Sequence, residues 1–284
     1  SASPIKVVMW NHMAGSALTV APDIANIAGL GGKTVAIPFW YSIHNVVLQK
    51  ILREHGLKVV EKNPQAGEVK LSVMAPSDMV AALANRAIAG FIVAEPFNAV
   101  AEAKGVGKVL RFSGDVWRDH ACCVTLMQEH DIARRPEWVQ NVVSALVEGQ
   151  AWAAGHRADT ALMLSKQGPH KYTPHEDKVL QNVLAPAPEA WARYTESGII
   201  RHPEWHQRRI DFQPYPYPSY TEKLVEMLKE THIAGVNRFL DELSPQHVAQ
   251  DLVDARFVKQ AVEAGQFQQL FGLNGWTREE MIAV

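Results

Sequence analysis

Hydrophobic residues along this chain form short β-branched runs that alternate with longer stretches of helical spacing. The clearest case is residues 33–56, in which the apolar run 33–37 predicts a strand buried on both faces. Over residues 43–55 the apolar positions recur at helical spacing and polar residues fill the other face, which predicts a helix. Ser42 is a favourable N-cap, and Gly56 stands where a glycine commonly ends a helix. The segment therefore predicts one strand that feeds one helix.

The joint between this strand and this helix is a candidate ligand site. In open α/β sheets, ligands bind where strands end and helices begin. A helix N-terminus offers free N–H groups and a partial positive charge, so the site favours an anion. An ordinary loop with chance aromatic residues is the alternative interpretation, and both stay open. The candidate ligand-binding residues at this joint are Trp40, Tyr41, Ser42, His44 and Asn45.

Strands and helices continue to alternate over residues 33–112, which is typical of a doubly wound, mainly parallel sheet. Ser77 is expected to cap a helix over 78–85. The strand ends at 38–45 and 95–98 are expected at one edge of the sheet, so that their residues converge. The other strand-like runs are 5–9, 17–21, 59–60, 69–73, 90–94, 108–112 and 121–127.

After residue 127 the pattern becomes helical. Pro136 is expected at the first position of a helix that extends to residue 156, whereas the proline-rich and aromatic segment 201–220 is expected to be irregular. We expect an α/β fold of two lobes, with doubly wound sheets, a hinge and a helix-rich C-terminal part. Residues 1–24 and 116–284 are assigned to lobe one and residues 25–115 to lobe two, with crossovers near 22–32 and 113–120.

Composition excludes several classes of function. The 284 residues carry 28 Lys and Arg against 30 Asp and Glu, a net charge of −2, with no basic run that indicates a nucleic acid or an anionic membrane. No apolar run approaches the roughly 18 residues of a membrane span. The first four residues are not a signal peptide, so the protein is expected to be cytoplasmic or to have lost a signal.

The two cysteines, Cys122 and Cys123, are adjacent in a predicted strand. Neighbours on a strand point to opposite faces, so the two thiols are expected to form a poor chelate and a poor disulfide pair. No CxxC or HExxH pattern occurs. We therefore expect no metal and no cofactor, and treat both cysteines as small apolar residues.

Several stretches of the chain resemble the substrate-binding proteins of ABC importers for nitrate, bicarbonate, sulfonates and taurine, which have the type II periplasmic-binding-protein fold. The most specific elements are SxHN at 42–45 and EPF at 95–97, followed by GDxWxxH at 114–120. Similar stretches surround them and cover about half of the chain in the expected order: GSALTV at 15–20, GKTVAIPFWYSIHNVVLQKILREHGL at 32–57, and the segments 79–110, 113–124 and 136–153.

The resemblance implies roles for three residues. His44 matches a histidine of the nitrate and bicarbonate branch that helps hold the oxyanion, and Arg118 matches a basic position that is usually lysine. Ser16 falls where that branch places a polar side chain on the ligand. Arginine in place of lysine presents a planar guanidinium that can donate two hydrogen bonds to a flat or a tetrahedral oxyanion. The ligand of this chain can therefore differ from that of the branch, and its identity stays open. In the alternative interpretation, His44 bonds its own loop and Arg118 pairs with Asp115 or Asp119.

The resemblance also implies a departure. Members of this group begin with a strand–helix–strand–helix block whose first loop lines the pocket, and this chain starts after that block. Lobe one is therefore expected to be incomplete at its N-terminus. A piece of a longer protein and an omitted N-terminal part are the favoured explanations, and a diverged protein that closes its lobe differently is the third.

Two further candidate ligand contacts come from the residues themselves. Trp10, with His12, follows a strand and is expected to face the cleft, although aromatic residues more often fill a core. Glu95, before Pro96, is placed to accept a hydrogen bond from a ligand, although a loop cap is the commoner role.

Together these features predict the solute-binding component of an ABC importer, a periplasmic monomer that closes two lobes over a small oxyanion and docks on a membrane permease. A cytoplasmic ligand sensor of the same fold is one alternative. The other is an enzyme for a small sulfur- or nitrogen-containing substrate, using His44, Glu95, His120 and the cysteines. Because the sequence has no nucleophile elbow, metal spacing or phosphate loop, no catalytic residue is assigned.

Overall fold

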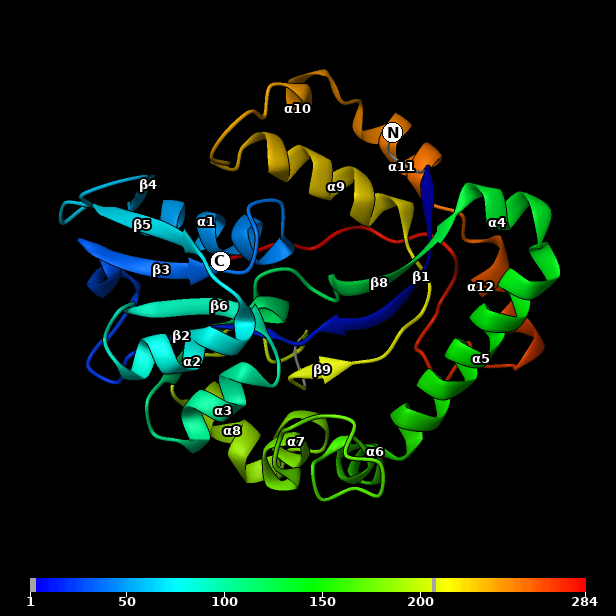
Figure 1. Ribbon diagram of the computed structural model, residues 1–284, viewed down its shortest axis with the longest axis horizontal. Coiled ribbons are helices and arrows are strands. Elements are labelled where there is room, and N and C mark those ends of the chain that lie inside the picture. Colours follow the sequence, from blue (N-terminus) through cyan, green and yellow to red (C-terminus); the bar gives the residue numbers. More distant parts are fainter. Residues whose placement is uncertain (1–3, 206–207) are drawn as a thin grey trace.

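A computed structural model describes residues 4–205 and 208–284 and contains two β-sheets with helices around them (Figure 1). The larger sheet has six strands in the order β4-β5-β3-β6-β2-β7, and the smaller has three in the order β8-β1-β9. The α/β architecture expected from the alternation of strands and helices is confirmed. Among the described residues, no helix is long and apolar enough to cross a membrane.

The six-stranded sheet contains the strand and helix with the clearest sequence pattern. Strand β3 is Lys33–Ile37 and helix α1 is Ile43–Glu54, capped by Ser42 and followed by Gly56 at φ 71°, as predicted. Strands β4, β5, β3 and β6 are parallel, whereas β2 runs antiparallel to both of its neighbours. The remaining elements are β2 Ser16–Val20, β4 Lys58–Val60, β5 Glu68–Val73, β6 Gly90–Ala94, β7 Lys108–Phe112, α2 Pro76–Ala84 and α3 Phe97–Ala103.

The three-stranded sheet is antiparallel and is covered by the C-terminal half of the chain (Figure 1). Its central strand β1 packs against the long helix α5, which starts at Pro136 as expected, and against helices α11 and α12. The elements are β1 Ile5–Ala14, β8 Ala121–Gln128, β9 Ile210–Asp211, α4 Glu129–Arg134, α5 Pro136–Gly155, α6 Arg157–Leu164, α7 Asp177–Leu184, α8 Pro188–Glu196, α9 Pro218–Lys229, α10 Phe239–Glu242, α11 Pro245–Leu252 and α12 Arg256–Ala264.

The chain passes between the two sheets at one residue, Gly15, which separates β1 from β2. Ala14 and Gly15 have φ angles of 51° and 75°, a left-handed turn that glycine adopts readily. The crossover predicted near 22–32 is therefore wrong, because β2 pairs with β6 and β7 in the larger sheet. The return passes through the short 3-10 turn Ser113–Asp115, within the predicted region 113–120. The strand pairing thus also contradicts the lobe boundary predicted at residue 24, since residues 16–20 lie in the larger sheet, whereas the boundary at residue 115 remains a prediction.

Local patterns also mispredicted some helix ends. Ser77 does not cap α2, because the helix begins one residue earlier at Pro76, and the Ser77 hydroxyl donates to its neighbour Asp78 at 3.4 Å. The proline-rich segment 201–220 is irregular over most of its described length, as predicted. It nevertheless supplies the two residues of β9 and the first turn of α9.

Candidate functional site

Ser16 and His44 lie against each other where the two sheets meet. Ser16 is the first residue of β2, directly after the Gly15 crossover, and His44 lies in the first turn of α1. The Ser16 Oγ is 2.9 Å from the His44 Nε2, and both side chains are buried. The structure therefore joins two residues that the sequence selected separately, 28 positions apart.

The His44 imidazole is neutral. Burial, followed by the nearby His120 and His12, lowers its pKa from 6.5 to about 3. Its Nδ1 atom is buried and has no hydrogen-bond partner among the described residues. An unpaired buried nitrogen costs about 1–3 kcal/mol, so this atom is suited to a ligand that restores the missing bond.

The other residues of the strand–helix joint hold its shape. The Ser42 hydroxyl donates to the Phe39 carbonyl and accepts from the Asn45 N–H, at 2.7 and 3.2 Å. The buried Asn45 amide donates to the Trp40 carbonyl at 2.7 Å. As ligand contacts, Ser42 and Asn45 remain a prediction, and their visible bonds are those of a helix cap and a loop brace.

Trp40 and Tyr41 face the C-terminal half of the chain. The Trp40 ring packs edge-on against His232, with centroids 5.9 Å apart. The Tyr41 ring lies 5.9 Å from the Phe239 ring, and its hydroxyl donates to the Val236 carbonyl at 3.5 Å. Both are partly exposed, so they can form the rim of a site and also link its two sides.

Ser113 and His120 form a second layer behind Ser16. The Ser113 hydroxyl donates to the Ser16 carbonyl at 3.0 Å and is 2.8 Å from the His120 Nε2. Both residues are buried, and burial lowers the pKa of His120 to about 4. Ser113 was not among the predicted site residues, but it directly precedes the GDxWxxH element, which also contains His120, and this position was the available signal.

The prediction that the two cysteines face opposite sides of their strand is wrong. In the pairing of β1 with β8, His12 lies opposite Cys123 and Met13 lies opposite Ala121, so Cys122 is the extra residue of a bulge. A bulge turns two successive side chains toward the same side. The Cys122 and Cys123 sulfurs are accordingly 4.0 Å apart, and the Cys122 Sγ is 3.6 Å from the Ser16 Oγ.

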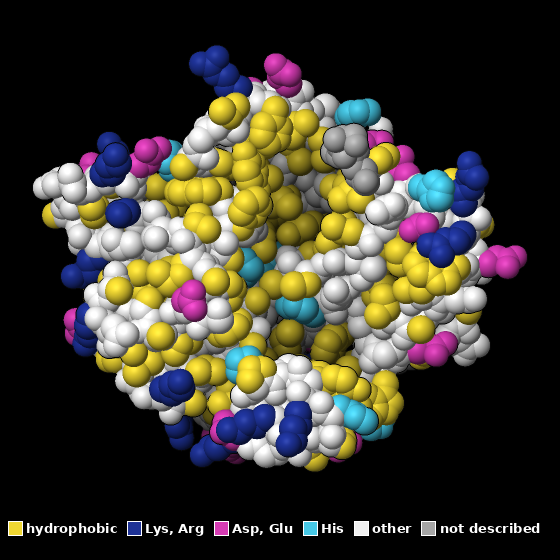
Figure 2. Space-filling view, in the orientation of Figure 1, with side chains coloured by type: hydrophobic (Ala, Val, Ile, Leu, Met, Phe, Trp, Pro, Cys, Tyr) yellow, Lys and Arg dark blue, Asp and Glu magenta, His cyan; other side chains and the backbone are white. Residues whose placement is uncertain are grey.

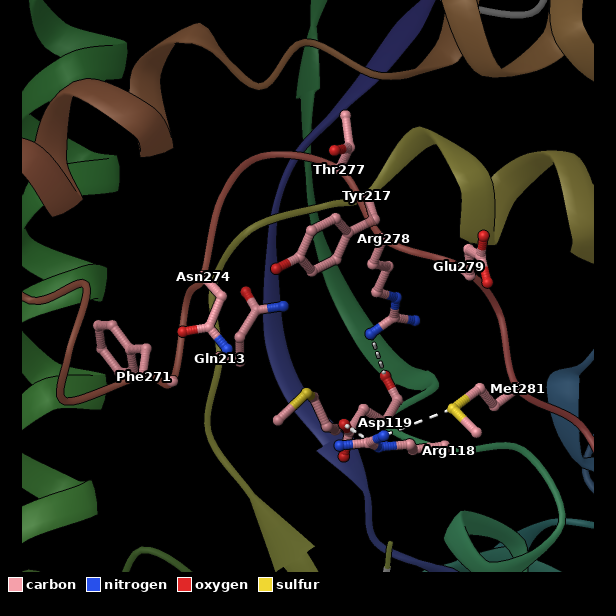
Figure 3. Close-up of a pocket in the computed structure, with 12 residues that line it drawn as sticks. Arg118, Asp119, Gln213, Tyr217, Phe271, Asn274, Thr277, Arg278, Glu279 and Met281 are labelled. Atoms are coloured by element: carbon pink, nitrogen blue, oxygen red, sulfur yellow. Dashed lines mark hydrogen bonds and ion pairs between the residues drawn. The ribbon is translucent and has the colours of Figure 1, made fainter.

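Arg118 lines a cavity, shown in Figure 3, whose lining does not include Ser16 or His44. Its guanidinium is 3.4 Å from the Asp119 carboxylate and donates to the Met281 sulfur at 3.4 Å. The cavity, of about 330 Å³, is also lined by Arg278, Gln213 and Tyr217 and by other residues of the C-terminal segment. Arg118 and His44 are not in contact among the described residues, so a shared role in holding one ligand remains a prediction. The pairing with Asp119 is the alternative that the sequence had left open.

Trp10 and Glu95 make contacts with other residues inside the protein. Trp10 is 1% exposed and packs edge-on against Tyr217 and Tyr220. One Glu95 carboxylate oxygen accepts from Arg209 at 2.7 Å and the other from the Ala99 N–H at 3.1 Å. Their roles as ligand contacts remain predictions, and the bonds that the structure shows are structural ones.

Figure 2 shows that the molecule is hollowed in the middle of the face drawn there. Histidine side chains, coloured cyan, lie on the wall of this hollow and are surrounded by hydrophobic ones. Lys and Arg side chains gather at the outer edge of the same face. Among the described residues, no ion pair or hydrogen bond joins a Lys or Arg to Ser16 or His44. The arrangement around Ser16 and His44 is therefore polar, buried and uncharged.

Comparison with known proteins gives a family and a fold. The model of the NMT1-like family matches residues 1–165. Over 85 residues the chain is 31% identical to the nitrate/nitrite binding protein NrtA of Nostoc sp. strain PCC 7120. That match covers 30% of this chain and 19% of the relative, so the chain spans about one fifth of the length of this curated relative.

Two solved structures show the same fold. The periplasmic nitrate-binding protein NrtA of Synechocystis PCC 6803 superposes with a TM-score of 0.72 at 14% identity, over 99% of this chain and 73% of that one. The periplasmic aliphatic sulphonate binding protein SsuA of Escherichia coli gives a TM-score of 0.58 at 16% identity, over 88% of this chain and 69% of that one. At sequence identities this low, the structural similarity shows the fold but does not identify the ligand.

Proposed function

The chain belongs to the NMT1-like family, and on that premise we propose that it is the substrate-binding component of an ABC importer for a small oxyanion. The names of its relatives, a nitrate/nitrite binding protein and a sulphonate binding protein, support this class of ligand. The proposed ligand contacts are Ser16 and His44, with the aromatic residues Trp40 and Tyr41 at the rim.

The observation that carries the proposal is the unpaired Nδ1 of His44 beside the Ser16 hydroxyl. If Ser16 donates to Nε2, the Nδ1–H of the neutral ring is free; if Nε2 donates to Ser16, the Ser16 O–H is free. In either tautomer the pair keeps one hydrogen for an acceptor. The N-terminus of α1, where His44 lies, adds a partial positive charge that favours an anion.

The fold also suits a transport role. The two sheets are joined by the short connection at Gly15 and the returning segment 113–120. A ligand that bonds groups from both sides stabilises the closed arrangement, which is the form that docks on a permease in this mechanism. We propose a periplasmic location, a monomeric state and a membrane permease as partner, in line with the periplasmic relatives.

Calorimetry tests this proposal with nitrate, bicarbonate, taurine and an alkanesulfonate as ligands. We expect at least one of them to bind with a stoichiometry of one and to be recovered unchanged after prolonged incubation. Failure of all four to bind would contradict the oxyanion assignment. Steady consumption of a bound ligand would instead establish the enzyme alternative, since a transport protein returns its ligand intact.

A further inference from the structure

Three metal-ligating side chains gather beside Ser16, and their hydrogen bonds are to one another and to Ser16. His12 comes from β1, and Cys122 and Cys123 come from the facing strand β8. One ligand atom from each of the three lies within 4.8 Å of the others. Both cysteines are free thiols, so no disulfide accounts for the cluster.

The strand pairing builds this cluster by two opposed irregularities. The register places Trp10 opposite Val124 and His12 opposite Cys123, which leaves Asn11 as an extra residue on β1. One step further, Cys122 is the extra residue on β8. Bulges of this kind re-aim side chains and are common beside functional sites. Regular pairing would have sent one of the two thiols to the far face of the sheet.

The spacing of the sulfurs fits a metal ion better than a disulfide. Two thiolates on one tetrahedral zinc ion, each about 2.3 Å from the metal, lie about 3.8 Å apart. The Cys122 and Cys123 sulfurs are 4.0 Å apart, so binding requires a shift of a few tenths of an ångström. A disulfide requires about 2.05 Å between the sulfurs and therefore a larger rearrangement.

The imidazole of His12 is also available to a metal. Its Nδ1 is buried and has no hydrogen-bond partner among the described residues. No hydrogen bond from His12 to the backbone is present in the described structure to hold the ring for a purely structural role. A buried polar atom without a partner is unfavourable in the empty site and gains if a ligand or ordered group engages it.

We propose that His12, Cys122 and Cys123 bind one Zn²⁺ ion, whose fourth coordination position lies on the side of Ser16. Two thiolates and one imidazole are ligands that zinc prefers, and three protein ligands leave one position open. The Ser16 hydroxyl, 3.6 Å from the Cys122 sulfur, links this position to His44. Two thiolates neutralise the charge of Zn²⁺, and each thiol that is protonated in the empty site releases its proton to solvent.

The metal site does not depend on the proposed transport function, but its consequence for the ligand does. In the described part of the chain, no Lys or Arg is bonded to the Ser16–His44 pair, and a neutral zinc centre with an open position offers an oxyanion a Lewis acid instead. On this view, zinc loading strengthens binding of the oxyanion, because the anion completes the fourth position of the metal.

Titration of the metal-free, reduced protein with Zn²⁺, and with Co²⁺ as a spectroscopic probe, tests the site. We expect one equivalent to bind, with protection of both thiols from a thiol reagent and a thiolate-to-cobalt charge-transfer absorption. Cys123→Ser and His12→Gln should each weaken zinc binding at least a hundredfold. Cys123 is exposed, so its serine variant should fold normally, and His170→Gln, at another exposed position, is the matched control that should bind zinc as the wild type does.

Three results would overturn the proposal. The first is zinc binding that the Cys123→Ser and His12→Gln variants leave unchanged. The second is binding of Cu⁺ with no binding of Zn²⁺, which would indicate that the two thiols alone form the metal site, without His12. The third is loss of both thiols in air as an intramolecular disulfide that Zn²⁺ does not prevent. Calorimetry with the oxyanions on metal-free and zinc-loaded protein separates the two proposals, since either binding reaction can fail while the other is retained.

Discussion

Replacement of Arg209 by methionine is expected to lower the free energy of unfolding by about 3–5 kcal/mol, because it leaves buried carboxylates without their cation. Arg209 is 1% exposed and donates to Glu95 at 2.7 Å, to the Tyr194 hydroxyl at 2.5 Å and to Glu102. Its backbone carbonyl accepts from the Gly15 N–H at 2.7 Å. Arg209 thus ties the segment before β9 to the Gly15 crossover through its backbone and to the carboxylates of the helix α3 region through its side chain.

The neighbouring Arg208 provides the control for this substitution. Its guanidinium is about half exposed and pairs with Asp211 at 3.5 Å across the surface. Arg208→Met should therefore change stability by no more than about 0.5 kcal/mol. Chemical denaturation of both variants measures the difference. Equal stability of the Arg208 and Arg209 variants would contradict the role given to the buried network, whereas adding Glu95→Gln to Arg209→Met should restore part of the loss.

The second large effect is a loss of stability between pH 6.5 and pH 4.5. Burial lowers the pKa of His44 to about 3 and that of His120 to about 4, from 6.5 in the unfolded chain. Between these values the unfolded state binds protons that the folded state does not, so stability falls as the pH falls. The two histidines together should contribute a loss of about 4 kcal/mol over this range.

The His44→Asn variant isolates this effect. Burial also raises the pKa of Glu95 and of Asp119, which acts in the opposite direction, but these carboxyls are present in both proteins. The difference in pH slope between wild type and His44→Asn should therefore approach about half of the predicted loss. His170→Gln, at an exposed position, should keep the wild-type slope. An unchanged slope in His44→Asn would show that His44 titrates normally in the folded protein.

Local patterns in the sequence predicted local structure well. The run 33–37, the cap Ser42 and the stop at Gly56 each act within a few residues, and strand β3 and helix α1 follow from them. The pairing of Ser16 with His44 was accessible only through the resemblance to a known family, because their separation of 28 positions leaves no periodic signal.

Features set by pairing between distant segments were not predictable. The runs 5–9 and 17–21 are both apolar, and nothing in either run tells which sheet it joins. The crossover was therefore predicted near 22–32, whereas the strand pairing places it at Gly15. The cysteine geometry depends on a bulge that exists only in the pairing of β1 with β8. Arg209 lies in an irregular segment and is separated from Glu95 by 114 positions, so no local sequence pattern predicts that the two residues pair.

Calorimetry of Ser16→Ala with the tightest-binding oxyanion tests whether the Ser16–His44 pair holds that ligand. In one tautomer the substitution removes a hydrogen bond to the charged ligand, and in the other it removes the bond that orients the His44 ring toward it. A loss of about 1.5–3 kcal/mol is expected, so binding should weaken by roughly tenfold to a hundredfold. Ser77→Ala, which removes an exposed hydroxyl that bonds Asp78, is the matched control and should bind as the wild type does. A Ser16→Ala variant that folds normally and binds the oxyanion with unchanged affinity would contradict the account.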